Sequence, residues 1–156
     1  MIYSKKLNCV EILLVSAHRG DYNCDQMIRE EVAILVIDDV NTMRIQIKEL
    51  LRSFGFRSIT ACANGEEAKK QLESSLFQLV LADWHTSPCD GMELLKFVRS
   101  HPVLKNLAFV MVTAENTREK VLEAIQAGVD DYLVKPLTPV QIQNKVYGVL
   151  LKRKVL

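Results

Sequence analysis

Five polar residues stand directly after short apolar runs, and their side chains are of the types that carry phosphoryl chemistry: Asp38, Asp39, Asp83, Thr113 and Lys135. Short continuous apolar runs bounded by polar residues are typical of strands buried on both faces, as in a parallel sheet. In an open α/β sheet the ligand site lies outside the carboxyl ends of the strands, so we expect these residues to meet there. An acidic cluster with one lysine and one hydroxyl suits a metal-assisted phosphoryl site.

Three carboxylates in one pocket repel one another, and a divalent cation with oxygen ligands is one remedy. Magnesium suits such a pocket best, because it needs few protein carboxylates and keeps several waters for substrate oxygens. Asp38 and Asp39 are adjacent, so on an ideal strand their side chains would point to opposite faces. We therefore expect both to lie where the strand turns into a loop, from where each can approach Asp83.

The rest of the sequence predicts the strands and helices that must position these residues. Apolar runs predict five strands, at 32–37, 57–63, 77–82, 107–112 and 132–134. Five amphipathic helix patterns alternate with them, and their expected N-terminal caps are Asn41, Asn64, Asp90, Asn116 and Thr138. Strand and helix thus alternate five times, which predicts an α/β fold with a five-stranded parallel sheet and helices on both faces.

These segments resemble the receiver domain of two-component response regulators, from about Glu31 to the C-terminus. The resemblance rests on an ordered set of motifs: LVIDD (35–39), LADW (81–84), DGMELL (90–95), VMVTA (110–114), AGVDDY (127–132) and VKP (134–136). The nearest likeness is the stand-alone, chemotaxis-type (CheY-like) receiver, because Asp83-Trp84, residues 112–115 and Tyr132 all look like that subgroup. The family implies a (βα)5 flavodoxin-like fold, in agreement with the alternation of strands and helices.

The resemblance assigns a role to each residue of the acidic site. Asp83 would be the phosphoacceptor, a nucleophile that attacks a phosphoryl group to form an aspartyl phosphate. Asp39 and Asp83 would bind Mg2+ directly and Asp38 through water, with the backbone carbonyl of His85 as the third protein ligand. Lys135 would neutralise charge on the phosphoryl oxygens in the transition state.

The resemblance also implies a conformational switch. Thr113 would donate its hydroxyl to a phosphoryl oxygen, which lets Tyr132 rotate from an exposed to a buried position. The face built from the fourth helix, fifth strand and fifth helix would change with it, as a shift of population between two states.

Two features depart from the family pattern. Chemotaxis-type members commonly carry a polar residue such as asparagine at position 85, where this chain has His85. Its backbone carbonyl can still bind the metal, but we expect its side chain to lie over the acyl phosphate and to alter the rate of hydrolysis. Pro88 stands five residues after Asp83 instead of the usual four, so we expect a different loop shape there.

Composition narrows the class of protein and its surroundings. The 156 residues are 49% hydrophobic and 25% charged, as in an ordinary soluble globular domain. The net charge of +1 gives no field that attracts nucleic acid, and no apolar run approaches the roughly 20 residues that span a bilayer. The four cysteines have neither zinc-site nor CxxC spacing, which indicates reduced thiols in the cytoplasm.

We expect two parts: an N-terminal extension of uncertain structure over residues 1–30 and a receiver over residues 31–156. Met27 precedes the first strand and is an alternative start. Because the sequence ends soon after the fifth helix pattern, we expect no output domain, and a signal that leaves by protein contact. The expected partners are a histidine kinase or phosphotransfer protein and a downstream protein target, for a monomer or weak dimer.

Other classes of function stay open at this point. A binding-only pseudo-receiver would not be phosphorylated, but the intact acidic trio with Thr113 and Lys135 argues against it. A flavodoxin-like enzyme needs a phosphate-binding loop after the first strand, where Asp38 and Asp39 would repel phosphate. An aspartate-nucleophile phosphatase needs a second carboxylate where His85 stands. We therefore expect a signalling switch that at most catalyses its own phosphorylation and dephosphorylation.

Overall fold

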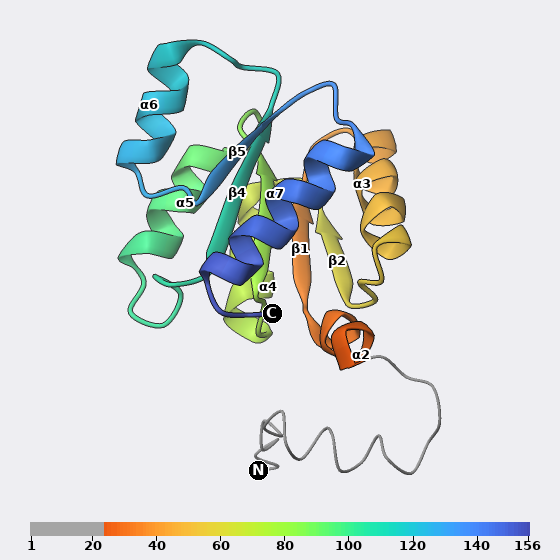
Figure 1. Ribbon diagram of the computed structural model, residues 1–156. Coiled ribbons are helices and arrows are strands. Elements are labelled where there is room, and N and C mark those ends of the chain that lie inside the picture. Colours follow the sequence, from red (N-terminus) through yellow and green to blue (C-terminus); the bar gives the residue numbers. More distant parts are fainter. Residues whose placement is uncertain (1–23) are drawn as a thin grey trace.

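The computed structural model describes residues 24–156, in which strands and helices alternate along the chain (Figure 1). The strands are β1 (Ile34–Ile37), β2 (Ile59–Cys62), β3 (Leu79–Asp83), β4 (Ala108–Thr113) and β5 (Asp131–Val134). The helices are α2 (Cys24–Glu31), α3 (Asn41–Ser53), α4 (Gly65–Ser74), α5 (Gly91–Ser100), α6 (Arg118–Gln126) and α7 (Pro139–Lys152). The predicted five-fold alternation is confirmed, and α2 precedes it.

All five strands pair in parallel in the order β2-β1-β3-β4-β5. β1 and β3 are neighbours, with Ile37 opposite Ala82, so the residues that follow β1 lie beside the end of β3. This order confirms the predicted parallel α/β fold and brings the acidic residues to one edge of the sheet. Within residues 24–156, no helix has the length and apolar character needed to cross a membrane.

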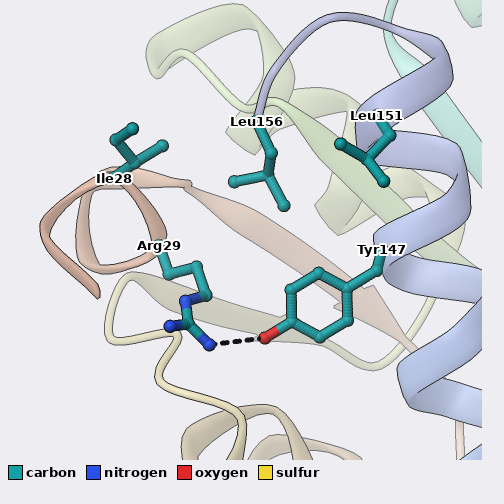
Figure 2. A pocket seen from close by; sticks show the side chains of 5 residues that line it. All are labelled: Ile28, Arg29, Tyr147, Leu151 and Leu156. Carbon is teal, nitrogen blue, oxygen red and sulfur yellow. Dashed lines mark hydrogen bonds between the residues drawn. The ribbon is translucent and has the colours of Figure 1, made fainter. Parts of the chain in front are cut away.

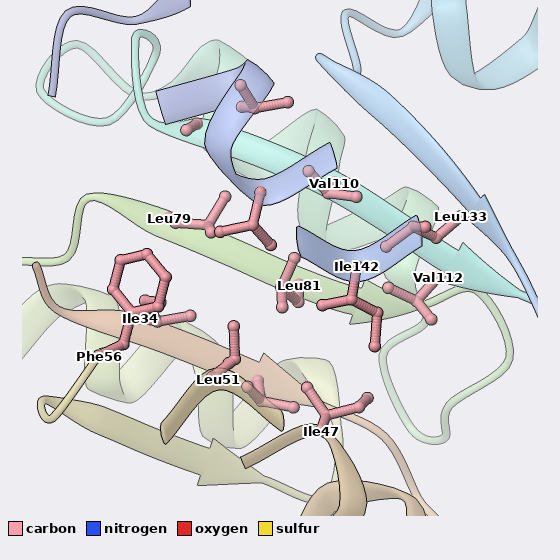
Figure 3. Close-up of a cluster of buried hydrophobic side chains, with 14 of the residues drawn as sticks. Ile34, Ile47, Leu51, Phe56, Leu79, Leu81, Val110, Val112, Leu133 and Ile142 are labelled. Carbon is pink, nitrogen blue, oxygen red and sulfur yellow. The ribbon is translucent and has the colours of Figure 1, made fainter. Parts of the chain in front are cut away.

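Hydrophobic side chains form two clusters, one on each face of the sheet. On one face, strand residues such as Ile34 and Leu81 pack against Ile47 and Leu51 of α3 and Ile142 of α7 (Figure 3). On the other face, the strands pack against buried side chains of α4, α5 and α6: Ala68, Leu72, Met92, Leu95, Val98 and Ala124. Burial on both faces explains why the strands appear in the sequence as continuous apolar runs.

Capping side chains fix where the helices begin. Two predicted caps, Asn41 and Asn116, are wrong by one residue. Val40 precedes α3 without a side-chain cap, and Asn41 already lies in the helix, where its side-chain oxygen accepts a hydrogen bond from Arg44 (3.1 Å). Thr117 caps α6 instead of Asn116, because its hydroxyl accepts from the backbone of the first turn. The predicted caps that accept from the third helical residue are confirmed at Asn64, Asp90 and Thr138.

Arg29 joins helix α2 by hydrogen bonds to the end of the sheet away from the acidic residues. The Arg29 guanidinium donates hydrogen bonds to the hydroxyl of Tyr147 in α7 (2.9 Å) and to the carbonyl of Phe54 after α3 (3.3 Å). The Tyr147 hydroxyl itself donates to the Phe54 carbonyl (3.1 Å). Beside this contact lies an open pocket of about 310 Å³ (Figure 2), whose other lining residues are Ile28, Leu151 and Leu156.

Candidate functional site

The three carboxylates predicted to form the site come together at the carboxyl edge of the sheet. Asp38 directly follows β1 and is fully buried, while Asp39, the next residue, is exposed. Asp83 is the last residue of β3 and is 7% exposed. One oxygen from each of the three carboxylates lies within 4.8 Å of the others. The turn of the chain after β1 therefore lets adjacent aspartates approach the same neighbour.

Lys135 joins two of these carboxylates. It follows β5, and its ammonium donates to Asp38 Oδ2 (2.7 Å) and to Asp83 Oδ2 (3.0 Å). Its backbone N–H donates to the carbonyl of Thr113 (2.8 Å), which fixes the start of the β5–α7 loop beside β4. The lysine thus reaches across β4 and β3 to the end of β1.

Burial and charge act in opposite directions on the pKa values of this cluster. Burial raises the pKa of Asp83, and the hydrogen bond and charge of Lys135 only partly reverse that rise. Burial alone would lower the pKa of Lys135, but the hydrogen bonds and charges of Asp38 and Asp83 together outweigh it and raise the pKa. The ammonium therefore stays charged at neutral pH, facing two carboxylates.

Two hydrogen bonds hold the loop after β1, one to the side chain of Asp38 and one to its backbone carbonyl. The Asp38 side chain accepts a hydrogen bond from the backbone N–H of Val40 (2.8 Å). The guanidinium of Arg44, in the first turns of α3, donates to the backbone carbonyl of Asp38 (2.6 Å). Arg44 was not among the residues predicted from the sequence, because a contact with a backbone atom leaves no pattern in residue types. The second side-chain oxygen of Asp38, Oδ2, is the one that accepts from Lys135.

Thr113 and Tyr132 meet at a third residue, Glu115. Thr113 ends β4 and is fully buried, and its hydroxyl oxygen accepts a hydrogen bond from the Glu115 N–H (3.1 Å). The Tyr132 hydroxyl donates to the carbonyl of Glu115 (2.8 Å), and the ring packs on the second hydrophobic cluster. Burial, followed by the charges of Glu115 and Asp83, raises the pKa of Tyr132 to about 12. Tyr132 is half-buried here, and the rotation expected of it stays a prediction.

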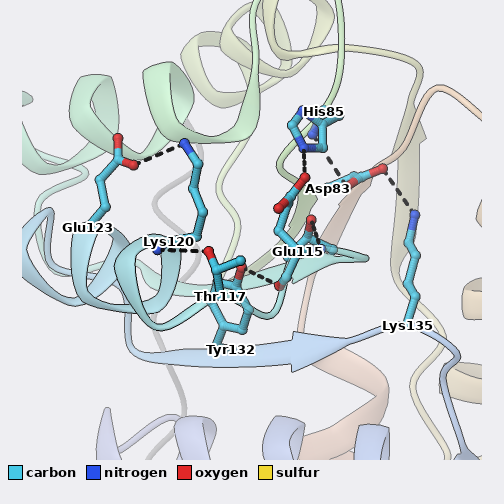
Figure 4. Close-up of polar contacts among 9 residues, drawn as sticks. Asp83, His85, Glu115, Thr117, Lys120, Glu123, Tyr132 and Lys135 are labelled. Atoms are coloured by element: carbon cyan, nitrogen blue, oxygen red, sulfur yellow. Dashed lines mark hydrogen bonds and ion pairs between the residues drawn. The ribbon is translucent and has the colours of Figure 1, made fainter.

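His85 lies at the surface and points to the β4–α6 loop. Its side chain is 61% exposed, and its Nε2 lies 3.1 Å from Glu115 Oε1 (Figure 4). The His85 backbone N–H donates to Asp83 Oδ1 at 3.4 Å. Glu115 was not among the predicted site residues. Its position could have been noticed, since it follows Thr113 by two residues just as His85 follows Asp83.

The chain after Asp83 folds back tightly onto the strand end. Gly91 N–H donates to the carbonyl of Trp84 (2.9 Å), and a Cβ at position 91 would collide with the backbone carbonyl of Asp83. Only glycine therefore permits α5 to begin this close to the end of β3. Trp84 is 3% exposed, and the ammonium of Lys120 lies 4.6 Å from its ring centre.

The donor set at this edge fits Mg2+. The cluster offers carboxylate oxygens from three aspartates, the hard ligands that this ion prefers. Against three carboxylates, one ammonium leaves an excess of negative charge that a divalent cation would balance. Asp39, exposed and not bonded to Lys135, is open to a partly hydrated ion.

Comparison with known proteins gives the same assignment as the geometry. Residues 34–147 match the model of the response regulator receiver domain. The chain is 38% identical to the chemotaxis protein CheY-3 of Vibrio cholerae over 122 residues, covering 78% of this chain and 94% of that protein. It is 42% identical to the chemotaxis protein CheY of Pseudomonas aeruginosa over 113 residues, covering 72% and 91%.

A solved structure agrees with these sequence matches. The putative response regulator of Chloroflexus aurantiacus superposes with a TM-score of 0.72 at 32% identity, covering 78% of this chain and 99% of that one. An aspartate-rich edge on a parallel sheet of this order, together with these matches, defines a signalling protein of the phosphoryl-receiving class. The chain belongs to the response regulator receiver domain family and is a CheY-like response regulator.

Proposed function

We propose that Asp83 is the residue that accepts the phosphoryl group, donated by a histidine kinase or a phosphotransfer protein. The observation that carries the proposal is the ammonium of Lys135 held between Asp38 and Asp83, at 2.7 and 3.0 Å, on a sheet edge with an excess of carboxylates. Asp83 is buried enough to be shielded from bulk water, yet it lies at the end of a strand where a donor can reach it. Receiver family membership implies a kinase partner of this class.

The transfer needs one new bond and one broken bond. An oxygen of the Asp83 carboxylate attacks phosphorus, and the bond from phosphorus to the donor breaks with its electron pair leaving on the donor. The Lys135 ammonium then pairs with a negatively charged phosphoryl oxygen, because the Asp83 carboxylate loses its charge when it becomes part of an acyl phosphate. Asp38 keeps the second contact and thereby holds Lys135 in place.

Mg2+ would be held by Asp39 and Asp83 directly, by Asp38 through water, and by the backbone carbonyl of His85. When bound, it supplies positive charge next to the transferring oxygens. Among the protein groups, Asp38 has the clearest supporting role, since its side chain also accepts from Val40 N–H and so fixes the loop that presents Asp39.

Thr113 and Tyr132 are proposed to carry the signal away from the site. The Thr113 hydroxyl accepts from Glu115 N–H, which leaves its proton free to be donated to a phosphoryl oxygen. Tyr132 contacts the same loop residue and lies in β5, which stands between α6 and α7 in the chain. Movement of this loop is therefore positioned to alter the face formed by α6, β5 and α7, to which a downstream protein would bind.

The same proposal covers the organisation of the chain. The receiver would comprise residues 31–156 and the preceding residues 1–30 would be an extension, of which α2 contacts the receiver through Arg29. The protein would act in the cytoplasm as a monomer or weak dimer, without nucleic acid as a partner. Its activity would be limited to its own phosphorylation and dephosphorylation.

Intact-mass measurement after incubation with acetyl phosphate and Mg2+ tests the proposal. One phosphoryl addition is expected in the wild type, lost on chelation and lost in Asp83→Asn. Asp90→Asn is the matched control, because Asp90 is a helix cap with no contact to the cluster, and it should be labelled like the wild type. Labelling of Asp83→Asn at the wild-type rate would overturn the assignment.

A further inference from the structure

Asp39 is the exposed carboxylate of the acidic cluster, and its side chain has no hydrogen bond or ion pair with the residues that the structure describes. Its direction therefore depends on the two planar peptide groups that flank it. The carbonyl of Asp38, which precedes Asp39, accepts a hydrogen bond from Arg44 (2.6 Å). The N–H of Val40, which follows Asp39, donates to Asp38 Oδ1 (2.8 Å). Both peptide groups next to Asp39 are thus fixed, and Arg44 holds the first of them.

The guanidinium of Arg44 is itself held in a defined direction. Nη1 donates to the Asp38 carbonyl, and Nη2 donates to Asn41 Oδ1 (3.1 Å). The backbone N–H of Arg44 donates to the carbonyl of Val40 (3.1 Å), which places the residue in the first turns of α3. Because the guanidinium is planar and bonded at both terminal nitrogens, it joins the start of α3 rigidly to the loop after β1.

We propose that Arg44 is a positioning residue for Asp39, and that it sets the affinity for Mg2+ through the peptide group between Asp38 and Asp39. The inference rests on the proposed function, in which Asp39 binds the ion directly. With the Arg44 contact in place, an oxygen of Asp39 lies within 4.8 Å of oxygens of Asp38 and Asp83. Without this contact the peptide group is released, and no other bond of the Asp39 side chain restores its direction.

A positive charge close to three carboxylates also has a direct electrostatic effect, and that effect has the opposite sign. If Arg44 acted only through its charge, it would repel a divalent cation, and its removal would strengthen Mg2+ binding. If Arg44 positions Asp39, its removal weakens binding, because a direct ligand loses its fixed direction. The direction of the change in Mg2+ affinity therefore separates the two roles.

Magnesium titration followed by the fluorescence of Trp84, the single tryptophan, measures this affinity without any phosphorylation. Residues that orient a metal ligand change metal affinity by about 10–100-fold when they are mutated. We expect Arg44→Met to raise the dissociation constant for Mg2+ about tenfold, the lower end, because Arg44 acts through the backbone. Arg44→Lys keeps the charge and loses the planar fork, so it should also raise the constant, whereas a role of charge alone predicts no change.

Lys48→Met is the matched control for loss of a positive charge from α3. Lys48 lies one helical turn after Arg44 and forms no hydrogen bond or ion pair within residues 24–156. Its replacement removes the same charge without releasing the loop after β1. The dissociation constant for Mg2+ should therefore be unchanged or slightly lower in this variant.

Combining Arg44→Met with Asp39→Ala identifies the residue through which Arg44 acts. The tenfold effect of Arg44→Met should disappear in the Asp39→Ala background, because the ligand that Arg44 positions is already gone. An effect that persists there, or an unchanged or lower dissociation constant in both Arg44→Met and Arg44→Lys, would overturn the proposal. Absence of Mg2+ binding by the wild-type protein would refute the proposed magnesium site, whereas binding that does not depend on Arg44 would refute the positioning role alone.

Discussion

Replacing Lys135 by methionine should destabilise the fold more than any other single lysine change near the site. The substitution keeps the aliphatic length of the side chain and removes the ammonium, so Asp38 and Asp83 lose their shared partner. Both carboxylates would remain at the buried edge of the sheet, where the Asp38 side chain is 1% and that of Asp83 is 9% exposed. Breaking a buried ion pair by removing one partner is costly because the other charge is left without compensation.

The size of the effect follows from burial. Removing one partner of a fully buried pair costs about 3–5 kcal/mol, and because Lys135 is itself 17% exposed we expect the lower end, about 3 kcal/mol. For a domain of this length that corresponds to a melting temperature lower by about 6–12 °C. The matched control is Lys145→Met, whose pair with Asp131 has the same 2.7 Å separation but is 42% and 31% exposed, and whose loss should cost about 0–1 kcal/mol.

The pH dependence of this difference has a definite sign. Burial raises the folded-state pKa of Asp83 above its unfolded value, so its charge opposes folding, and stability falls as the pH rises through that range. Lys135 limits this loss by lowering the pKa, and its removal lets the pKa rise further. The gap between Lys135→Met and wild type should therefore be small near pH 4 and should widen towards pH 7.

Urea unfolding followed by the fluorescence of Trp84, the single tryptophan, measures both variants across this pH range. Added Mg2+ should recover part of the loss in Lys135→Met, because the ion compensates the same carboxylates. Equal destabilisation by Lys135→Met and Lys145→Met, or a gap that does not depend on pH, would show that Lys135 does not neutralise the buried acidic cluster.

Three further outcomes are expected. Asp130→Ala should lower the free energy of unfolding by about 3 kcal/mol in urea titrations, because the buried carboxylate pairs with Arg99 (3.0 Å) and Arg153 (2.7 Å); a loss below about 1 kcal/mol would contradict this. In an absorbance titration, Tyr132→Phe should remove a tyrosine ionisation near pH 12. If the ionisation that the variant loses lies at a lower pH instead, burial does not raise the pKa of the Tyr132 hydroxyl. Deleting residues 1–23 should change the melting temperature by less than about 4 °C, whereas a larger drop would show that this segment stabilises the receiver.

The fold could be predicted from the sequence because its signals are local. Five apolar runs and three of the five expected caps fall where the structure has them, and each depends on residues close together in the chain. The helix start at Asn116 was misplaced because asparagine and threonine are both good caps and stand side by side here, and the start at Asn41 was misplaced because α3 begins after Val40 without any side-chain cap. Thr117 next to Asn116 shows how little the sequence separates them.

The acidic site could also be predicted from the sequence, because parallel strands place their last residues at one edge of the sheet. Asp38, Asp83 and Lys135 meet there as expected. The contact of His85 with Glu115 was missed because it joins residues 30 apart through two loops whose course no residue pattern defines. The attachment of α2 through Arg29 and Tyr147, which are 118 residues apart, was missed for the same reason.

Locating the acyl phosphate on the polypeptide tests the central claim most directly. The protein is phosphorylated with acetyl phosphate and Mg2+, reduced with borohydride so that an aspartyl phosphate becomes homoserine, and digested for tandem mass spectrometry. Homoserine at position 83, with Asp38 and Asp39 unmodified, is the predicted result. Conversion at Asp38 or Asp39, or a stable phosphoryl group on Thr113 or His85, would contradict it.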